Sequence, residues 1–126
     1  MIYGIGTDLV AISRMDDLVN RYGRRFASRI LTRLELIEYD ETKRPSVFLA
    51  KHFAAKEAFA KAIGSGLRSP VNLKSIGIEH DILGAPNFIL DDTLNKHLAK
   101  LGIKRSLLSI TDEISHAMAF VVLEKL

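Results

Sequence analysis

The segment from about Val47 to Ile63 constrains the fold of this 126-residue sequence more than any other feature. Between Phe48 and Ile63, eleven of sixteen residues are apolar. Because an α-helix turns by ~100° per residue, these side chains point in nearly every direction around the axis. The pattern predicts a long helix that is buried on most sides. A chain of this length is typical of one domain, so we expect a single domain over residues 1–126, built around this helix.

The charged residues of this helix need partners. Glu57 points in a direction that apolar and glycine residues surround, and Lys61 follows it at the i+4 position. A carboxylate in such surroundings is costly unless it is paired with a cation or binds one. Glu57 is therefore a candidate ligand for a metal ion.

A second carboxylate with apolar and glycine neighbours lies near the N-terminus. The alternation from Ile2 to Ile12 predicts a strand whose one face holds Ile2, Gly4, Gly6, Asp8, Val10 and Ile12. Asp8 and Glu57 could hold Mg²⁺ while Lys61 meets a phosphate, and backbone amides around Gly64 and Gly66 could approach that phosphate. The alternative is an ordinary Glu57–Lys61 helix ion pair, with Asp8 capping a loop.

The remaining elements have recognisable start and stop signals. Ser13 with Asp16, and Thr32 with Glu35, resemble capping boxes; Ser46 is a candidate cap of the long helix; Gly23 and Gly64 are candidate stops. The expected order is βαααββαββ, which favours an α+β fold with a mostly antiparallel sheet packed against the long helix. The expected segments after the first strand are helices over Ser13–Tyr22, Thr32–Tyr39 and Val47–Ile63, a hairpin of Leu73–His80 and Asn87–Leu90, a helix between Asp91 and Gly102, and a last hairpin of Leu107–Thr111 and His116–Leu123.

Composition excludes several classes of site. With no cysteine there is no thiolate metal site or disulfide framework, and the chain suits a reducing compartment. The longest apolar run, Ala117–Leu123, is far shorter than the ~20 residues of a membrane helix, and the first residues lack a leader pattern. We therefore expect a cytoplasmic protein. The four histidines form no i, i+4 helical pair, so each is expected at a surface or interface.

The net charge of +3 is concentrated in one segment. Ser13–Arg29 holds five arginines against two aspartates, while the rest of the chain is neutral. Arginine suits carboxylate and phosphate groups, so the segment indicates an acidic protein or a nucleic acid as partner. A solvated helix face is the plain alternative.

Two motifs resemble those of a known family. Gly4-Ile5-Gly6-Thr7-Asp8-Leu9-Val10 with Arg14, and the run from Phe48 to Gly66, resemble the two signatures of the holo-acyl-carrier-protein synthases, the short bacterial 4′-phosphopantetheinyl transferases. The turn Leu83–Pro86 and the hairpin from Ser109 to Ala119 are also similar to that family. The resemblance extends from about Ile2 to Leu123.

This resemblance implies transfer of the 4′-phosphopantetheine arm from coenzyme A to a serine of apo-acyl carrier protein, with release of 3′,5′-ADP, in support of fatty acid biosynthesis. It implies that Asp8 and Glu57 bind Mg²⁺ and that Lys61 acts with them in catalysis beside the phosphates. Glu57, or a water that it holds, is the candidate base. The implied coenzyme A contacts are Lys61, Gly64, Ser65, Gly66, His52 and Pro86.

The resemblance also implies a homotrimer with sites between subunits, and contact of Arg14, Arg21 and Arg24 with an acidic helix of the carrier protein. No membrane or nucleic-acid partner is implied. The sequence departs from the family pattern at three positions. His52 stands where arginine is usual, Leu107 where histidine is frequent, and Ala11 where an acidic residue is common.

Two rival functions remain open from the sequence. The first is a small nucleic-acid-binding module that uses the arginine-rich segment, although aromatic residues are scarce. The second is a subunit that binds carrier protein without catalysis.

Overall fold

The computed structural model describes all 126 residues and contains five helices and five strands. In chain order they are β1 (Ile2–Ala11), α1 (Ile12–Tyr22), α2 (Arg24–Ile30), α3 (Arg33–Glu41), α4 (Pro45–Ile63), the short 3₁₀ turn η1 (Leu73–Ser75), β2 (Ile76–His80), β3 (Pro86–Leu90), α5 (Asp92–Lys100), β4 (Ile103–Asp112) and β5 (His116–Lys125). The predicted order lacked α2.

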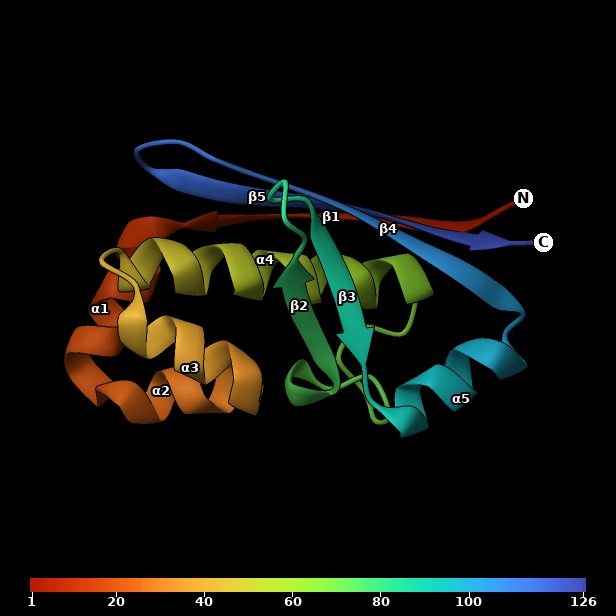
Figure 1. The fold of residues 1–126 in the computed structure, drawn as a ribbon, viewed down its shortest axis with the longest axis horizontal. Coiled ribbons are helices and arrows are strands. Elements are labelled where there is room, and N and C mark those ends of the chain that lie inside the picture. The colour runs from red at the N-terminus through yellow and green to blue at the C-terminus, as the bar shows by residue number, and fades with distance from the viewer.

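The architecture places α4 between a sheet and the other helices. A three-stranded antiparallel sheet of order β1-β5-β4 lies along one side of α4. Helices α1 to α3 and the β2–β3 hairpin lie on the other side (Figure 1). This arrangement confirms the α+β fold with a mostly antiparallel sheet on a long buried helix.

Helix α4 is buried along most of its length, as its composition predicts. Eleven of its nineteen residues are buried, Leu49 and Phe59 completely. The helix begins at Pro45 with Arg44 as N-cap, so the prediction of Ser46 as the cap is wrong. Proline has a preset φ and no amide hydrogen, which suits the first helical position. Ser46 Oγ instead donates to Asp16 Oδ1 at 2.8 Å and ties α4 to α1.

Strand β1 and helix α4 approach each other unusually closely. A Cβ atom on Gly6 would lie 2.0 Å from the carbonyl oxygen of Ala58, and one on Gly4 would lie 2.1 Å from that of Ala62. Only glycine therefore fits at these two positions. The face of β1 that also carries Asp8 is thus pressed directly against the helix that carries Glu57.

Several boundary predictions are confirmed and others are wrong. Thr32 and Glu35 form the expected capping box of α3, and Gly64 ends α4 in the left-handed conformation. Gly23 ends α1, but a new helix, α2, starts at the next residue. Ser13 lies inside α1 and caps nothing, because the N-cap position is Ala11. The last hairpin is also longer than expected at both ends.

The face of the β1-β5-β4 sheet away from α4 is apolar and exposed. It carries large side chains that are 39% to 64% exposed. The strand register brings them together, since Leu9 pairs with Met118 and Leu107 pairs with Val122. The other exposed members are Ile5 and Phe120. No helix of the chain has both the length and the apolar character needed to cross a bilayer.

Candidate active site

Asp8, Glu57 and Lys61 come together where β1 crosses α4. The Lys61 ammonium donates to the Thr7 carbonyl oxygen at 2.9 Å and lies 3.2 Å from Asp8 Oδ1. Lys61 is thus paired with Asp8 and not with Glu57, so the alternative of an ordinary Glu57–Lys61 helix ion pair is wrong. The Asp8 side chain is 16% exposed, whereas Lys61 remains more than half exposed. The cluster therefore lies at the surface, open to a ligand.

Glu57 is half-buried and has no cation in direct contact with its carboxylate. Burial raises the pKa of Glu57, and the negative charge of Asp8 raises it further, while Lys61 and Arg14 lower it. Asp8 must therefore lie close enough to repel the Glu57 carboxylate. Two carboxylates that disfavour each other's charge are an arrangement that a cation between them relieves.

The donor set at this crossing suits Mg²⁺ bound together with a phosphate ligand. Magnesium prefers oxygen ligands, keeps several waters, and is commonly held by one or two carboxylates plus substrate phosphates. The chain supplies two carboxylates here, and no group of three or more acidic or histidine side chains is placed to hold a metal by itself. The other oxygens would have to come from a ligand and from water.

The backbone amides in the turn after α4 are less available to a ligand than the glycines of the turn suggest. The backbone N–H groups of Gly64 and Gly66 both donate to the Ala60 carbonyl, at 3.2 and 3.3 Å. Both N–H groups are therefore engaged within the chain, and contact of Gly64, Ser65 and Gly66 with a phosphate stays a prediction. The Ser65 hydroxyl donates to the Gly66 carbonyl oxygen at 2.9 Å.

A second charged cluster lies on the other side of α4, and the sequence did not predict it. Lys56 is completely buried and donates to Glu35 Oε1 at 2.6 Å and to the carbonyl oxygens of Ile30 and Leu73 at 2.7 and 2.9 Å. Glu35 Oε2 accepts from His52 Nδ1 at 2.5 Å and from the Ile78 N–H at 3.2 Å. Burial favours the neutral form of Glu35, but its hydrogen bonds and charge interactions with His52 and Lys56 outweigh this effect and lower its pKa to about 2.

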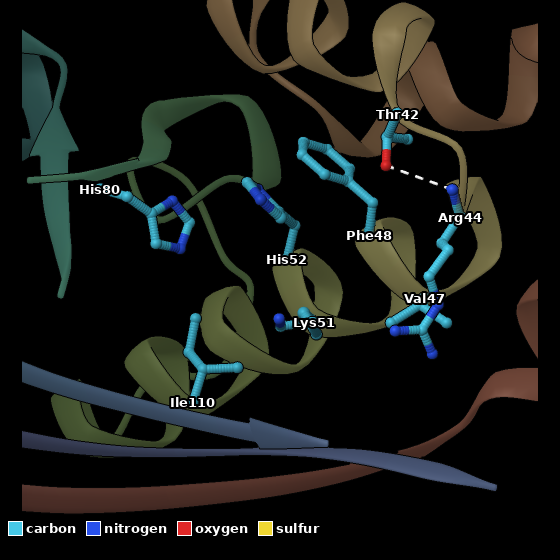
Figure 2. Close-up of a pocket in the computed structure, with 8 residues that line it drawn as sticks. All are labelled: Thr42, Arg44, Val47, Phe48, Lys51, His52, His80 and Ile110. Atoms are coloured by element: carbon cyan, nitrogen blue, oxygen red, sulfur yellow. Dashed lines mark hydrogen bonds between the residues drawn. The ribbon is translucent and has the colours of Figure 1, made fainter. Parts of the chain in front are cut away.

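His52 is buried, which contradicts the expectation of a surface or interface histidine. Its ring stacks on Phe48 with 4.0 Å between ring centroids and lies 6.3 Å from the ring of His80. His52 and His80 line a pocket beside the first turns of α4, which Figure 2 shows with Lys51 and Arg44. Pro86 pairs with His80 in the β2–β3 hairpin, so it belongs to the same neighbourhood.

The predicted coenzyme A contacts therefore fall into two groups. Lys61 accompanies Asp8 and Glu57, whereas His52 and Pro86 lie beside the pocket on another side of α4. Lys61 follows His52 by nine positions on α4, which places the two side chains about 180° apart around the helix axis. Within a single chain, the group around Lys61 and the group around His52 therefore lie apart.

The arginine-rich segment is divided by its contacts. Arg24 forms a two-pronged ion pair with Asp40 at 2.9 and 2.8 Å, so it is already engaged within the chain. The guanidinium of Arg21 lies 6.0 Å from the Tyr22 ring centroid, and that of Arg14 lies 6.0 Å from the Phe53 ring, beside Glu57. Arg25 and Arg29 line a surface hollow with Tyr22 and Phe26. Of the three arginines predicted to bind a partner, Arg14 and Arg21 have no acidic partner in the chain.

Comparison with known proteins gives a consistent picture. Residues 4–119 match the family model of the 4′-phosphopantetheinyl transferase superfamily. Holo-[acyl-carrier-protein] synthases of Nitrosospira multiformis and Neisseria meningitidis are 54% and 51% identical over 125 residues, which is 99% of this chain and the whole of each relative.

Solved structures agree with the sequence comparison. The crystal structure of the Neisseria meningitidis synthase covers 99% of this chain and all of its own, with a TM-score of 0.96 and 51% identity. The Bacillus anthracis synthase in complex with CoA (3′,5′-ADP) covers 99% of this chain and 98% of its own, with a TM-score of 0.85 and 33% identity.

Proposed function

The chain belongs to the 4′-phosphopantetheinyl transferase superfamily and transfers the phosphopantetheine arm of coenzyme A to apo-acyl carrier protein; on that premise we propose that the transfer depends on Mg²⁺ held by Asp8 and Glu57. The observation that carries this proposal is the gathering of these two carboxylates with Lys61 at the β1–α4 crossing. The resemblance drawn from the two sequence motifs is confirmed by the family match.

The residues of this chain have distinct parts in the reaction. Bound Mg²⁺ would neutralise the pyrophosphate of coenzyme A and the charge that develops on the 3′,5′-ADP leaving group. Asp8 and Glu57 provide its protein ligands. Lys61, which pairs with Asp8 in the free protein, is exposed enough to exchange that contact for a phosphate oxygen. Glu57, or a water that its carboxylate holds, takes the proton of the attacking serine.

The functional unit that we propose is a homotrimer with its sites between subunits. Two observations support it. The contacts expected for one coenzyme A lie on two sides of α4, and the outer face of the β1-β5-β4 sheet exposes contiguous apolar side chains that include Leu9, Leu107 and Phe120. Apolar surface of this kind is commonly an interface. Sedimentation velocity is expected to give a trimer, and Phe120→Lys is expected to shift it towards monomer.

The carrier protein is expected to bind the surface of α1 and α2. Arg14 and Arg21 have no acidic partner in the chain, and Arg25 and Arg29 flank a surface hollow that also contains Tyr22 and Phe26 and that side chains of an acidic helix can contact. We place the reaction in fatty acid biosynthesis and in the cytoplasm, a reducing compartment that suits a chain without cysteine.

Intact-mass spectrometry tests the proposal. The protein is incubated with coenzyme A, MgCl₂ and an apo-acyl carrier protein, and the carrier is expected to gain the mass of one phosphopantetheine arm. EDTA is expected to prevent the gain. Asp8→Asn and Glu57→Gln are expected to slow it by about a hundredfold or more, whereas Asp92→Asn, at the exposed start of α5, is expected to match the unaltered chain. Undiminished transfer in EDTA would refute the magnesium site.

A further inference from the structure

A groove between α3 and the β2–β3 hairpin has no part in the reaction described above. Its volume is about 430 Å³, and small-molecule sites in proteins commonly measure ~300–1,000 Å³. None of the residues assigned above to Mg²⁺, coenzyme A or the carrier protein lines it. Its elements lie on the opposite side of α4 from the β1-β5-β4 sheet (Figure 1). The groove is therefore a separate feature of the molecule.

The middle of the groove is apolar. Leu34 and Ile37 from α3 and Ile89 from β3 line it, and these side chains are 65%, 55% and 42% exposed. A Cβ atom on Gly77, which also lines the groove, would lie 2.9 Å from the Ile89 carbonyl oxygen. The absence of a side chain at Gly77 therefore leaves room between the helix and the hairpin, and an aliphatic ligand there would cover apolar surface that now faces water.

Helix α3 and strand β2 run in the same direction along the groove. Near their starts, the γ-methyl carbon of Thr32 lies 3.6 Å from the position of a Cβ atom on Gly77. About one turn further along α3, Glu35 accepts from the Ile78 N–H at 3.2 Å. The groove therefore has one end beside the start of both elements and the other end further along both.

The first of these ends is basic. Arg33 and Lys74 line the groove there, and neither forms an ion pair within the chain. The buried Lys56 ammonium brings their segments together, because it donates both to the Ile30 carbonyl oxygen before α3 and to the Leu73 carbonyl oxygen in η1. Two cationic side chains without acidic partners can thus meet an anionic group at this end.

Ser75 adds a hydroxyl group at the basic end. The residue lines the groove and is only 7% exposed, and its hydroxyl forms no hydrogen bond within the chain. It is not among the sealed polar atoms, so it is reached from the groove. The carboxylate of Asp91, nearby, is engaged as the N-cap of α5 and accepts from the Leu94 N–H at 2.9 Å. A ligand oxygen would supply the partner that the Ser75 hydroxyl lacks.

The other end of the groove is acidic. Glu38 on α3 and Glu79 on β2 line it, and neither forms an ion pair within the chain. Glu38 lies close enough to His80, the residue after Glu79, for its charge to favour protonation of that ring. An anionic group is therefore attracted to one end of the groove and repelled from the other.

We propose that this groove binds an aliphatic carboxylate. The carboxylate group lies against Arg33, Lys74 and the Ser75 hydroxyl, and the chain runs over Gly77 towards Ile37. The opposite charges of the two ends set this orientation, since the reversed ligand would place its carboxylate beside two glutamates. The proposal does not depend on the transfer reaction, so either can fail without the other.

Isothermal titration of the intact protein with octanoate, octylamine and butanoate tests the class of ligand. Octylamine has an equally long chain with a cationic group, and it is expected to bind about tenfold more weakly than octanoate, the scale of one charge-assisted hydrogen bond. Butanoate keeps the carboxylate but has a shorter chain, and it is also expected to bind at least about tenfold more weakly. Equal binding of octanoate and octylamine would overturn the proposal.

Substitutions locate the binding. Ile37→Asp places a carboxylate in the apolar middle and is expected to abolish octanoate binding, whereas Ile82→Asp, in the exposed turn of the β2–β3 hairpin, is expected to bind as the unaltered chain does. Lys74→Gln is expected to weaken octanoate binding about fivefold without weakening octylamine binding. Lys96→Gln, at an exposed position of α5 outside the groove, is its control.

Ser75→Ala separates a ligand contact from a structural role. Because the hydroxyl has no partner in the chain, the melting temperature is expected to stay unchanged, while the affinity for octanoate falls about threefold. Octanoate binding that persists in Ile37→Asp, or that weakens equally in Lys74→Gln and Lys96→Gln, would show that the ligand binds elsewhere and would refute the site. Phosphopantetheine transfer in the mass assay reports separately on the function proposed above.

Discussion

Two charged clusters lie on different sides of helix α4, and they differ in how completely their charged groups are paired. The inner cluster, formed by Glu35, His52 and Lys56, is buried, and the Lys56 ammonium makes three hydrogen bonds. The outer cluster, formed by Asp8, Glu57 and Lys61, is partly exposed and contains one ion pair, between Lys61 and Asp8 at 3.2 Å. Both clusters combine carboxylate and ammonium groups, so residue types alone do not distinguish them.

The two clusters differ in how many of their polar groups are hydrogen-bonded and in how far their side chains are exposed to solvent. The inner cluster connects α2, α3, η1, α4 and β2 through hydrogen bonds, and a buried network of this kind is costly to break once it is fully paired. In the outer cluster, burial and, to a lesser extent, repulsion from Asp8 raise the pKa of Glu57. Incomplete pairing of this kind is typical of a site that awaits a ligand.

The largest expected effect is on the inner cluster. Glu35→Ala leaves the Lys56 ammonium buried without a counter-charge, and we expect the free energy of unfolding at pH 7 to fall by about 3–5 kcal/mol. Urea denaturation measures it, with Glu38→Ala on the exposed side of α3 as control. A loss no larger than the control's would contradict the assignment.

The pH dependence of that loss is a further check. Folding lowers the pKa of Glu35 from 4.5 to about 2, so its stabilising effect is complete above pH 4.5 and disappears as pH falls towards 2. The difference in stability between the unaltered chain and Glu35→Ala is therefore expected to shrink over this interval.

A smaller effect, of opposite sign, is expected at the outer cluster. Because folding raises the pKa of Glu57, its ionised carboxylate destabilises the metal-free protein at neutral pH. Glu57→Gln is therefore expected to leave the melting temperature unchanged or slightly higher without Mg²⁺, while phosphopantetheine transfer is lost. Differential scanning fluorimetry beside the mass assay measures both, and a marked drop in melting temperature would place Glu57 with the structural cluster.

The smallest effect is expected in the arginine-rich segment. Arg24 is exposed and paired with Asp40, and such surface pairs contribute little. Arg24→Ala is expected to change KM for the carrier protein less than Arg21→Ala does, because Arg21 has no acidic partner in the chain. Steady-state kinetics with varied carrier protein compares them. An equal increase in KM for both variants would show that Arg24 leaves Asp40 to bind the partner.

The sequence predicted the features that arise from patterns along one segment. The apolar density of α4, the alternation of β1 and the capping box of α3 each report local geometry. The start of α4 was misplaced because Pro45 initiates it without a side-chain cap, and α2 was missed because Gly23 both ends α1 and precedes the next helix directly.

The outer cluster was predictable because Asp8 and Glu57 each had apolar and glycine neighbours, where a carboxylate needs a cation. The inner cluster was not, because the capping box already accounted for Glu35 and its contact with Lys56 spans 21 residues. The burial of His52 was missed for the same reason, because its contact with Glu35 joins residues 17 positions apart. Contacts between segments that are far apart in the chain produce no regular spacing of residues, so they cannot be predicted from the sequence pattern.

We propose that Asp8 and Glu57 bind the metal on which transfer depends. Calorimetric titration of Mg²⁺ into the protein with saturating 3′,5′-ADP measures this binding directly. We expect one binding event per site in the unaltered chain and in Asp92→Asn, and none in Asp8→Asn or Glu57→Gln. Equal Mg²⁺ binding in all four proteins would contradict it.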